Sequence, residues 1–212
     1  MSATTTVSTP PPSSLTTLIS QSGSADPISA LTTQVLHNLQ YQHLWTSLRI
    51  HNLSSLSSSQ PVSATTTAPT TPLLISGIPP HRVYTHPDEQ VYMLELGLRD
   101  EDLLPERVFV LPTAQGQSWS LRKLAAVFDS LPEPGEQQLS SSETSDNSSS
   151  AAVDKAKAAK LARYYERRRK ANASKEWGGK RLLLAMVDRA MGGDGTVVYY
   201  IVQEGNVKPR QN

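Results

Sequence analysis

The stretch that decides the fold is LLLAMV, residues 182–187, followed after a loop by TVVYYIVQ, residues 196–203. Both segments are short and rich in the apolar residues that form strands. The connecting loop, residues 188–195, contains the turn signal Gly-Gly-Asp-Gly. The pattern therefore predicts an antiparallel hairpin with an extended loop.

The second strand of this hairpin is apolar on both faces. Side chains alternate across a strand, so one face carries Val197, Tyr199 and Ile201 and the other carries Val198, Tyr200 and Val202. Two interpretations remain open. Either this is a central strand covered by helices on both sides, or one face lies on the chain's own core and the other on a partner subunit.

The N-terminal part alternates between ordered and loose segments. Residues 1–25 are a Ser/Thr/Pro-rich tail, which we expect to be disordered because it has little apolar surface to bury. Asp26-Pro27 is typical of a helix start, and apolar residues at helical intervals extend the predicted helix to about residue 49. Residues 52–72 are again Ser, Thr and Pro and predict a surface loop.

The middle of the chain predicts two strands and a helix. Residues 73–78 are an apolar run stopped by two prolines, and residues 107–111 form a second run that we expect to end at Pro112. Residues 83–98 give no clear assignment. Ser118 is expected to cap a helix with an apolar face that contains Leu121, Leu124, Ala125, Phe128 and Leu131.

A low-complexity insert and a basic segment separate this part from the hairpin. Residues 132–150 have almost no hydrophobic side chains and are predicted to be disordered. Residues 151–181 hold eleven Lys or Arg against three acidic residues, which predicts a solvated basic helix outside the core. Residues 26–131 and 182–212 would then complete one α/β domain, a small mixed sheet flanked by helices.

The composition excludes several classes of protein. The chain has no cysteine, which rules out disulfides and thiolate metal sites and fits an intracellular protein. No apolar run approaches the roughly 20 residues that span a bilayer. The spacing of His37, His43 and His51 does not suit a metal site on one helical face. A metal pair at His81 and His86 is a weak alternative to an exposed loop. No cofactor is expected.

The hairpin, with its strand ending in Val-Asp, its Asp/Gly loop and its paired tyrosines, resembles the C-terminal hairpin of the tRNA-intron endonuclease family. The tail, residues 205–212, resembles that of the small non-catalytic subunit of tRNA-splicing endonuclease. Residues 39–45 and 108–113 are similar to the fungal form of that subunit. The resemblance implies the C-terminal-like α/β domain of that family and a structural subunit of a heterotetramer in the nucleus that excises introns from pre-tRNA.

The resemblance also implies two contact sites. In that family the paired-tyrosine strand lies against a neighbouring catalytic subunit, which makes Val198, Tyr199, Tyr200 and Ile201 the interface candidates. The acidic loop docks into a second catalytic subunit, and Asp188 and Asp194 match it here. The loop of this chain is longer and carries an added positive charge at Arg189. The chain could also form a homodimer when alone.

Catalysis by the isolated chain is not expected. Catalytic members of the family use a tyrosine, a histidine and a lysine to drive attack of a ribose 2′-OH on its phosphate. Lys180 falls where that lysine would be, yet no histidine occurs after His86. We therefore predict no catalytic residues in this chain, which disfavours a free-standing nuclease.

An RNA-binding module is the alternative function. Its basic segment would contact phosphates without reading sequence. A solvated or nuclear-import segment is the plainer interpretation of the same residues. The RNA-binding candidates are Lys160, Arg163, Arg167, Arg168, Arg169 and Lys170.

Overall fold

The computed structural model describes residues 13–21, 27–53, 73–132, 151–188, 196–204 and 206–209. Its centre is a six-stranded sheet with the order β1-β2-β3-β4-β5-β6. Neighbouring strands pair antiparallel except β3 and β4, which run parallel. The predicted α/β class and mixed sheet are thus confirmed. The strands are β1 Thr46–Asn52, β2 Leu73–Ile78, β3 Val108–Ala114, β4 Arg181–Asp188, β5 Thr196–Gln203 and β6 Asn206–Pro209.

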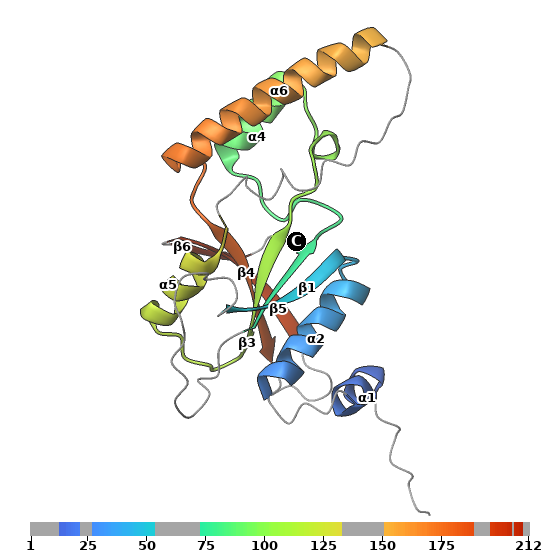
Figure 1. Ribbon diagram of the computed structural model, residues 1–212, viewed down its shortest axis with the longest axis vertical. Coiled ribbons are helices and arrows are strands. Elements are labelled where there is room, and N and C mark those ends of the chain that lie inside the picture. The colour runs from blue at the N-terminus through green and yellow to red at the C-terminus, as the bar shows by residue number, and fades with distance from the viewer. Residues whose placement is uncertain are drawn as a thin grey trace, which may run out of the picture.

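Helices lie on both sides of the sheet and at one end of it (Figure 1). One side holds α2, whose apolar residues pack on β2 to β5, and the opposite side holds α5. At the end of the sheet, α6 lies across α4 as a separate layer. The helices are α1 Ser14–Gln21, α2 Pro27–Tyr41, α4 Pro87–Leu96, the 3₁₀ turn η1 Asp100–Asp102, α5 Leu121–Ser130 and α6 Ala151–Ser174. Among the described residues, no helix is long and apolar enough to cross a membrane.

Each side of the sheet has its own core. The core on the α2 side contains Leu31, Val35 and Leu39 from the helix. Their partners from the sheet are Ile75, Val110, Leu183, Ala185, Val187, Tyr199 and Ile201. The core on the α5 side contains Val127, Phe128 and Leu131 packed on Leu74, Phe109, Leu111, Leu182 and Val202. The strict alternation of these lists along β4 and β5 shows why both strands are apolar on two faces.

The predicted helix over residues 27–49 is too long. The helix α2 ends at Tyr41, and the N–H of His43 donates to the carbonyl of Asn38. Left-handed backbone at Leu44 (φ 56°) then turns the chain into β1, and Ser47 (φ 50°) lies at an irregularity inside that strand. Trp45 is 4% exposed and packs in the α2-side core, so its apolar character belongs to the sheet junction and not to a helical face.

Several other boundaries differ from expectation. The strand β3 passes through Pro112, which pairs with Ala185, and ends at Ala114. The cap of α5 is Ser120 and not Ser118, because the Ser120 hydroxyl accepts from the N–H of Lys123. The tail expected over residues 1–25 includes the helix α1, in which Leu15 is buried. Most of the expected loop at 52–72 and insert at 132–150 lies outside the described residues.

The unassigned segment 83–98 contains the helix α4. His86 caps its N-terminus by accepting the N–H of Asp88 at its Nδ1, and Pro87 occupies the first turn. Gly97 ends the helix with a left-handed backbone (φ 66°), and its N–H donates to the carbonyl of Leu94. These are ordinary start and stop signals, but the helix carries few apolar residues at regular spacing.

The basic helix α6 is not the solvated element that its composition predicts. Tyr164 and Ala171 are fully buried, and Arg168 is 5% exposed. Tyr164 packs with Met93, Leu98 and Leu103 in a third apolar cluster between α4 and α6. The sequence does not predict this contact, because two of the buried positions are the polar residues Tyr164 and Arg168 and not aliphatic ones.

A buried group of charges fastens α6 to the rest of the domain; we call it the Glu89 cluster. Glu89 is 1% exposed, and its Oε1 accepts from the Tyr164 hydroxyl at 2.5 Å and from Arg82 Nη1 at 3.2 Å. Arg168 lies 3.6 Å from Glu89 and 2.8 Å from Glu106 through its Nε and Nη2 atoms. The five members of the Glu89 cluster are Arg82, Glu89, Glu106, Tyr164 and Arg168.

These partners keep Glu89 ionised. Burial by itself raises the pKa of the carboxyl, but the Tyr164 hydrogen bond and the two guanidinium groups outweigh burial and hold the pKa below its ordinary value of 4.5. Glu89 therefore contributes stability that is present above pH 4.5 and is lost as the pH falls through its lowered folded pKa. Burial also raises the pKa of Tyr164, so its hydroxyl stays protonated and donates.

Replacing Tyr164 by Phe is expected to cost about 1–3 kcal/mol of unfolding free energy at pH 7, because a hydrogen bond to a buried carboxylate is lost. The loss should shrink below pH 4.5 as Glu89 becomes protonated. Denaturant unfolding at a series of pH values measures it.

Tyr165→Phe is the matched control, because the neighbouring hydroxyl accepts a neutral backbone N–H from Leu104 at 2.8 Å. Its cost should be smaller and should not change over the same pH range. Equal costs for the two variants at every pH would show that Glu89 is not held ionised by Tyr164.

Candidate partner interface

The C-terminal hairpin is present as predicted, and its register shows which side chains share a face. The strands β4 and β5 pair from Arg181 opposite Gln203 to Asp188 opposite Thr196. On the α5 side, Met186 lies opposite Val198 and Leu184 lies opposite Tyr200. The loop that contains Asp194 lies outside the described residues.

The helix α5 covers only one end of this side of the hairpin. Leu182 and Val202 are buried beneath it, whereas Leu184 packs only at its margin. Beyond Leu184, Val198 is 39% exposed, and Met186 and Tyr200 are half-buried. We call the group Leu184, Met186, Val198 and Tyr200 the outward hairpin face. It is a continuous apolar surface of the kind that partner proteins cover.

The other two predicted interface residues belong to the chain's own core. Tyr199 is 7% exposed, its hydroxyl donates to Asn38 Oδ1 at 2.6 Å, and its ring meets His43 edge-on. Ile201 is 5% exposed in the same core. Among the described residues, the strand thus has one face in its own core and one face that α5 covers only in part. Tyr199 and Ile201, which were predicted to face a partner, pack in the chain's own core. The neighbouring Asp188 is half-buried at the end of β4.

The predicted RNA-binding residues of α6 fall into two groups. Lys160, Arg163, Arg169 and Lys170 are exposed, and Lys170 pairs with Glu166 one helical turn away. Arg167 is half-buried, pairs with Glu176 and lies 5.7 Å from the centre of the Trp177 ring. Arg168 is buried in the Glu89 cluster, so its assignment to RNA binding is wrong. In a run of basic residues, the sequence alone does not distinguish an arginine that is buried from one that is exposed.

Lys180 has a structural partner. Its ammonium group donates to the carbonyl of Leu131 at 2.8 Å, just past the end of α5. The contact ties the start of β4 to the end of α5. The lysine that the family resemblance placed at a catalytic position is therefore engaged in holding the fold.

A serine–histidine pair occurs in the sheet but is not arranged for nucleophilic attack. His51 Nε2 lies 2.7 Å from the Ser76 hydroxyl. Burial, with help from Arg107 and Arg49, lowers the pKa of His51, so the ring is neutral at pH 7. Ser76, however, has no exposed surface, and Arg107 also donates to its hydroxyl at 3.1 Å. The pair joins β1 to β2 and does not present a nucleophile to substrate.

The histidines near α4 serve the loop and the helix cap. His86 Nδ1 accepts the N–H of Asp88, and His81 is exposed on the preceding turn. Within the described ranges, no group of three or more His, Asp or Glu side chains could hold a metal ion.

Comparison with known proteins gives two matches. A family model described as Sen15 protein matches residues 34–151 and 151–212. A protein of Neurospora crassa, named probable tRNA-splicing endonuclease subunit tsp-1, is 33% identical over 205 residues, which covers 92% of this chain and 72% of the relative. The matched residues include the hairpin and the tail on which the resemblance rested. The chain therefore belongs to the Sen15 family, and its similarity to the small subunit of tRNA-splicing endonuclease is confirmed.

Proposed function

We propose that this chain is a non-catalytic structural subunit of a heterotetrameric tRNA-splicing endonuclease and positions a catalytic subunit through its outward hairpin face. The observation that carries the proposal is the split of β5: Tyr199 is buried in the chain's own core, while Val198 and Tyr200 lie on the uncovered side. Family membership and the name of the fungal relative support the choice of complex. A nuclear location, a homodimer of the free chain and docking of the Asp188–Asp194 loop remain predictions.

Burial energetics favour a partner on this face. Burying a fully exposed large apolar side chain contributes roughly 1.5–3 kcal/mol. The side chains of this face are already partly buried, so each would contribute a fraction of that value, and together they could form the centre of an interface. Tyrosine suits this position because its ring buries apolar area while its hydroxyl can still reach a polar partner. The face is too small to act alone, since stable interfaces bury about 800 Å² on each protein. Neighbouring loops would supply the remainder.

A structural role is also supported by the chemistry that the chain lacks. Cleavage by 2′-OH attack needs a proton acceptor, a proton donor and a positive group around one phosphate. The sequence after His86 contains no histidine, and Lys180 is bound to a main-chain carbonyl. Tyr164 is fully buried with its hydroxyl on Glu89, so it is not placed to accept a proton from substrate.

Changing Tyr200 to Ser is expected to weaken association with the catalytic subunit by about tenfold or more, since loss of one buried aromatic contact at an interface centre costs about 2 kcal/mol. Pull-down of the catalytic subunit by the purified chain, with quantification of Kd, measures the change. The melting temperature of the free chain should fall only slightly.

Tyr199→Ser is the matched control on the opposite face. It should lower the melting temperature strongly, because it opens the α2-side core and removes the bond to Asn38. If Tyr200→Ser binds the catalytic subunit as well as the parent chain, the outward hairpin face is not the interface.

Changing Lys180 to Gln should leave pre-tRNA cleavage by the reconstituted complex within about threefold of the parent rate. Loss of a group that stabilises charge in the transition state would instead cost about 100-fold or more. Single-turnover cleavage by complexes of equal composition makes the comparison. A loss of about 100-fold with normal assembly and melting would overturn the non-catalytic assignment.

A second role, holding RNA, is favoured by the exposed basic side of α6. Arg163 and Arg169 are exposed on the helix, where the backbone phosphates of a pre-tRNA could reach them, whereas the exposed Lys160 places its ammonium group near Gly97 at the end of α4. Phosphate contacts of this kind carry no base specificity and weaken as salt rises. This role is compatible with the structural one, because a subunit of the complex could help to hold the substrate.

Changing Arg163 and Arg169 together to Gln should weaken pre-tRNA binding by the complex equally for unrelated tRNAs. It should flatten the dependence of log K on log salt by about two, one for each lost contact. Filter binding at a series of salt concentrations measures both effects.

The matched control is Arg122→Gln with Lys123→Gln, which removes the same charge from exposed positions on α5. An equal change of slope in both double variants would indicate that only the net charge matters and that α6 does not contact RNA.

A further inference from the structure

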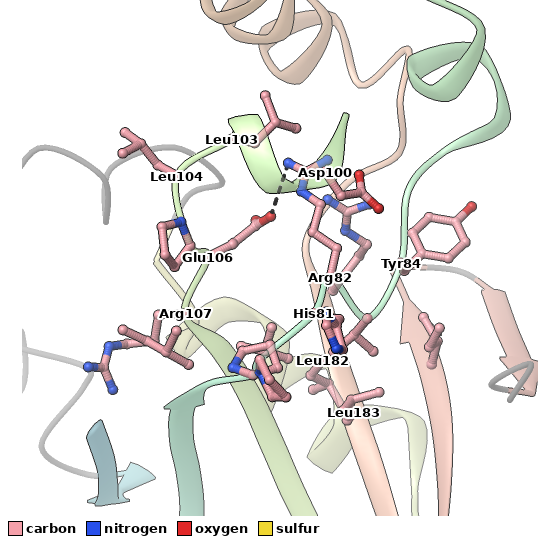
Figure 2. A pocket seen from close by; sticks show the side chains of 18 of the residues that line it. His81, Arg82, Tyr84, Asp100, Leu103, Leu104, Glu106, Arg107, Leu182 and Leu183 are labelled. Carbon is pink, nitrogen blue, oxygen red and sulfur yellow. Dashed lines mark ion pairs between the residues drawn. The ribbon is translucent and has the colours of Figure 1, made fainter. Parts of the chain in front are cut away.

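A pocket of about 380 Å³ lies where the loops that flank α4 meet the ends of β2, β3 and β4. Figure 2 shows it from close by, with Leu103 and Leu104 at the top of the view and Leu182 and Leu183 at the bottom. The volume of the pocket is in the range of small-molecule sites. None of the four residues of the outward hairpin face lines it. A ligand in the pocket would therefore leave the proposed partner interface uncovered.

The wall of the pocket is mostly apolar, from its depth to its rim. Leu103, Leu183 and Ile201 line it and are buried in the domain. Leu104 is 55% exposed and lies at the surface, next to the exposed Pro105. The other apolar residues of the lining are Ile78, Pro79, Pro80, Val83, Val108 and Leu182. Apolar surface that water reaches inside a pocket is stabilised when an apolar ligand covers it.

The charged side chains of the lining balance in number. Three are arginines and three are carboxylates, namely Arg82, Arg107, Arg181, Asp100, Glu101 and Glu106. The pocket therefore offers no excess of one sign that would attract an ion of the other sign.

The arginines are also poorly available to a ligand. Arg82 lies 3.8 Å from Glu106 in an ion pair, and its Nε has almost no accessible surface. Arg181 lies over the ring of Tyr84, 5.3 Å from the ring centre, and its Nη1 is equally inaccessible. Arg107 turns away toward β1, as Figure 2 shows, and donates to a main-chain carbonyl of that strand at 2.8 Å. An anionic ligand would thus gain little from these three side chains.

The carboxylates do not select a cation either. Glu106 is held by Arg168, whose Nη2 lies 2.8 Å from the Oε2 of Glu106. Asp100 and Glu101 are exposed, where solvent screens their charge. A charged ligand that enters the pocket would lose part of its hydration without gaining a buried partner, whereas a neutral apolar ligand has little hydration to lose. Size, wall and charge together favour a neutral ligand.

We propose that this pocket binds a neutral aromatic small molecule, similar in size to indole, whose ring packs on Val83, Leu103 and Leu183. Apolar contact holds the ligand, and no charge is needed. An aromatic ring suits the site because it covers a large apolar area and has no rotatable bonds to immobilise. The site belongs to the subunit itself, needs neither RNA nor a partner chain, and does not rest on the proposed function.

Titration of the full chain with indole, followed by two-dimensional NMR, tests the proposal. Saturable shifts of the lining residues are expected with a Kd of about 1 mM, as for other small fragments. Indole-3-carboxylate and tryptamine carry the same ring with a negative and a positive charge. Each should bind at least about fivefold more weakly, because its charge is partly desolvated without a partner. The proposal fails if the shifts do not saturate at about ten times the expected Kd. It also fails if the shifts lie outside the pocket, or if either charged analogue binds as tightly as indole.

A variant at the rim tests the location of the site. Leu104→Asp replaces an apolar lining residue by a charged one and should weaken indole binding by about threefold or more. Leu94→Asp is the matched control, because Leu94 is a 70% exposed leucine of α4 that does not line the pocket, and its Kd should equal that of the parent. Melting curves confirm that both variants are folded. An unchanged Kd in folded Leu104→Asp, or an equal loss in Leu94→Asp, would overturn the proposal.

Discussion

The architecture depends on the burial of one carboxylate. Glu89 sits on α4 and is compensated by Arg82 from the preceding loop and by Tyr164 and Arg168 from α6, more than 70 residues later in the chain. A buried ion that loses its partners costs several kcal/mol, so docking of the loop before α4, of α4 and of α6 is expected to be cooperative. This requirement sets the start of β4, because α6 leads directly to that strand. The strand β4 then pairs parallel with β3, which joins β1 to β3 and β4 to β6 into one six-stranded sheet.

The parts of the fold that sequence predicts are those where apolar pattern and packing agree. The strands β2, β4 and β5 and the helix α5 each bury an apolar face that is visible in their spacing. The end of α2 was missed because Leu44, Trp45 and Leu48 continue the helical spacing after the chain has turned. The docking of α6 was missed because Arg168 and Tyr164 are buried against the carboxylates of Glu89 and Glu106. Whether an arginine has a carboxylate partner is a property of tertiary structure.

The interface candidates show the same limit at finer scale. Alternation along β5 predicts that Tyr199 and Tyr200 point in opposite directions, and the structure confirms it. Which of the two faces is covered depends on the lengths of α2 and α5 and on where each lies over the sheet. α2 reaches Tyr199 through Asn38, whereas α5 ends its cover near Leu184. No local pattern in the hairpin encodes that difference.

The short strand β6 decides how a neighbour can approach the edge of the sheet. It pairs with Tyr200 to Gln203, so the main-chain groups of that half of β5 are already taken. Its last residue, Pro209, has no N–H to offer, which makes it a poor template for a further strand. Pairing of a further strand with this half of the edge is therefore unfavourable. A partner protein would bind through side chains on the face of the sheet and not through main-chain hydrogen bonds at its edge. By covering this part of β5, β6 makes edge-to-edge association of the sheet with another chain less favourable, and it does not cover the exposed Val198 of the outward hairpin face.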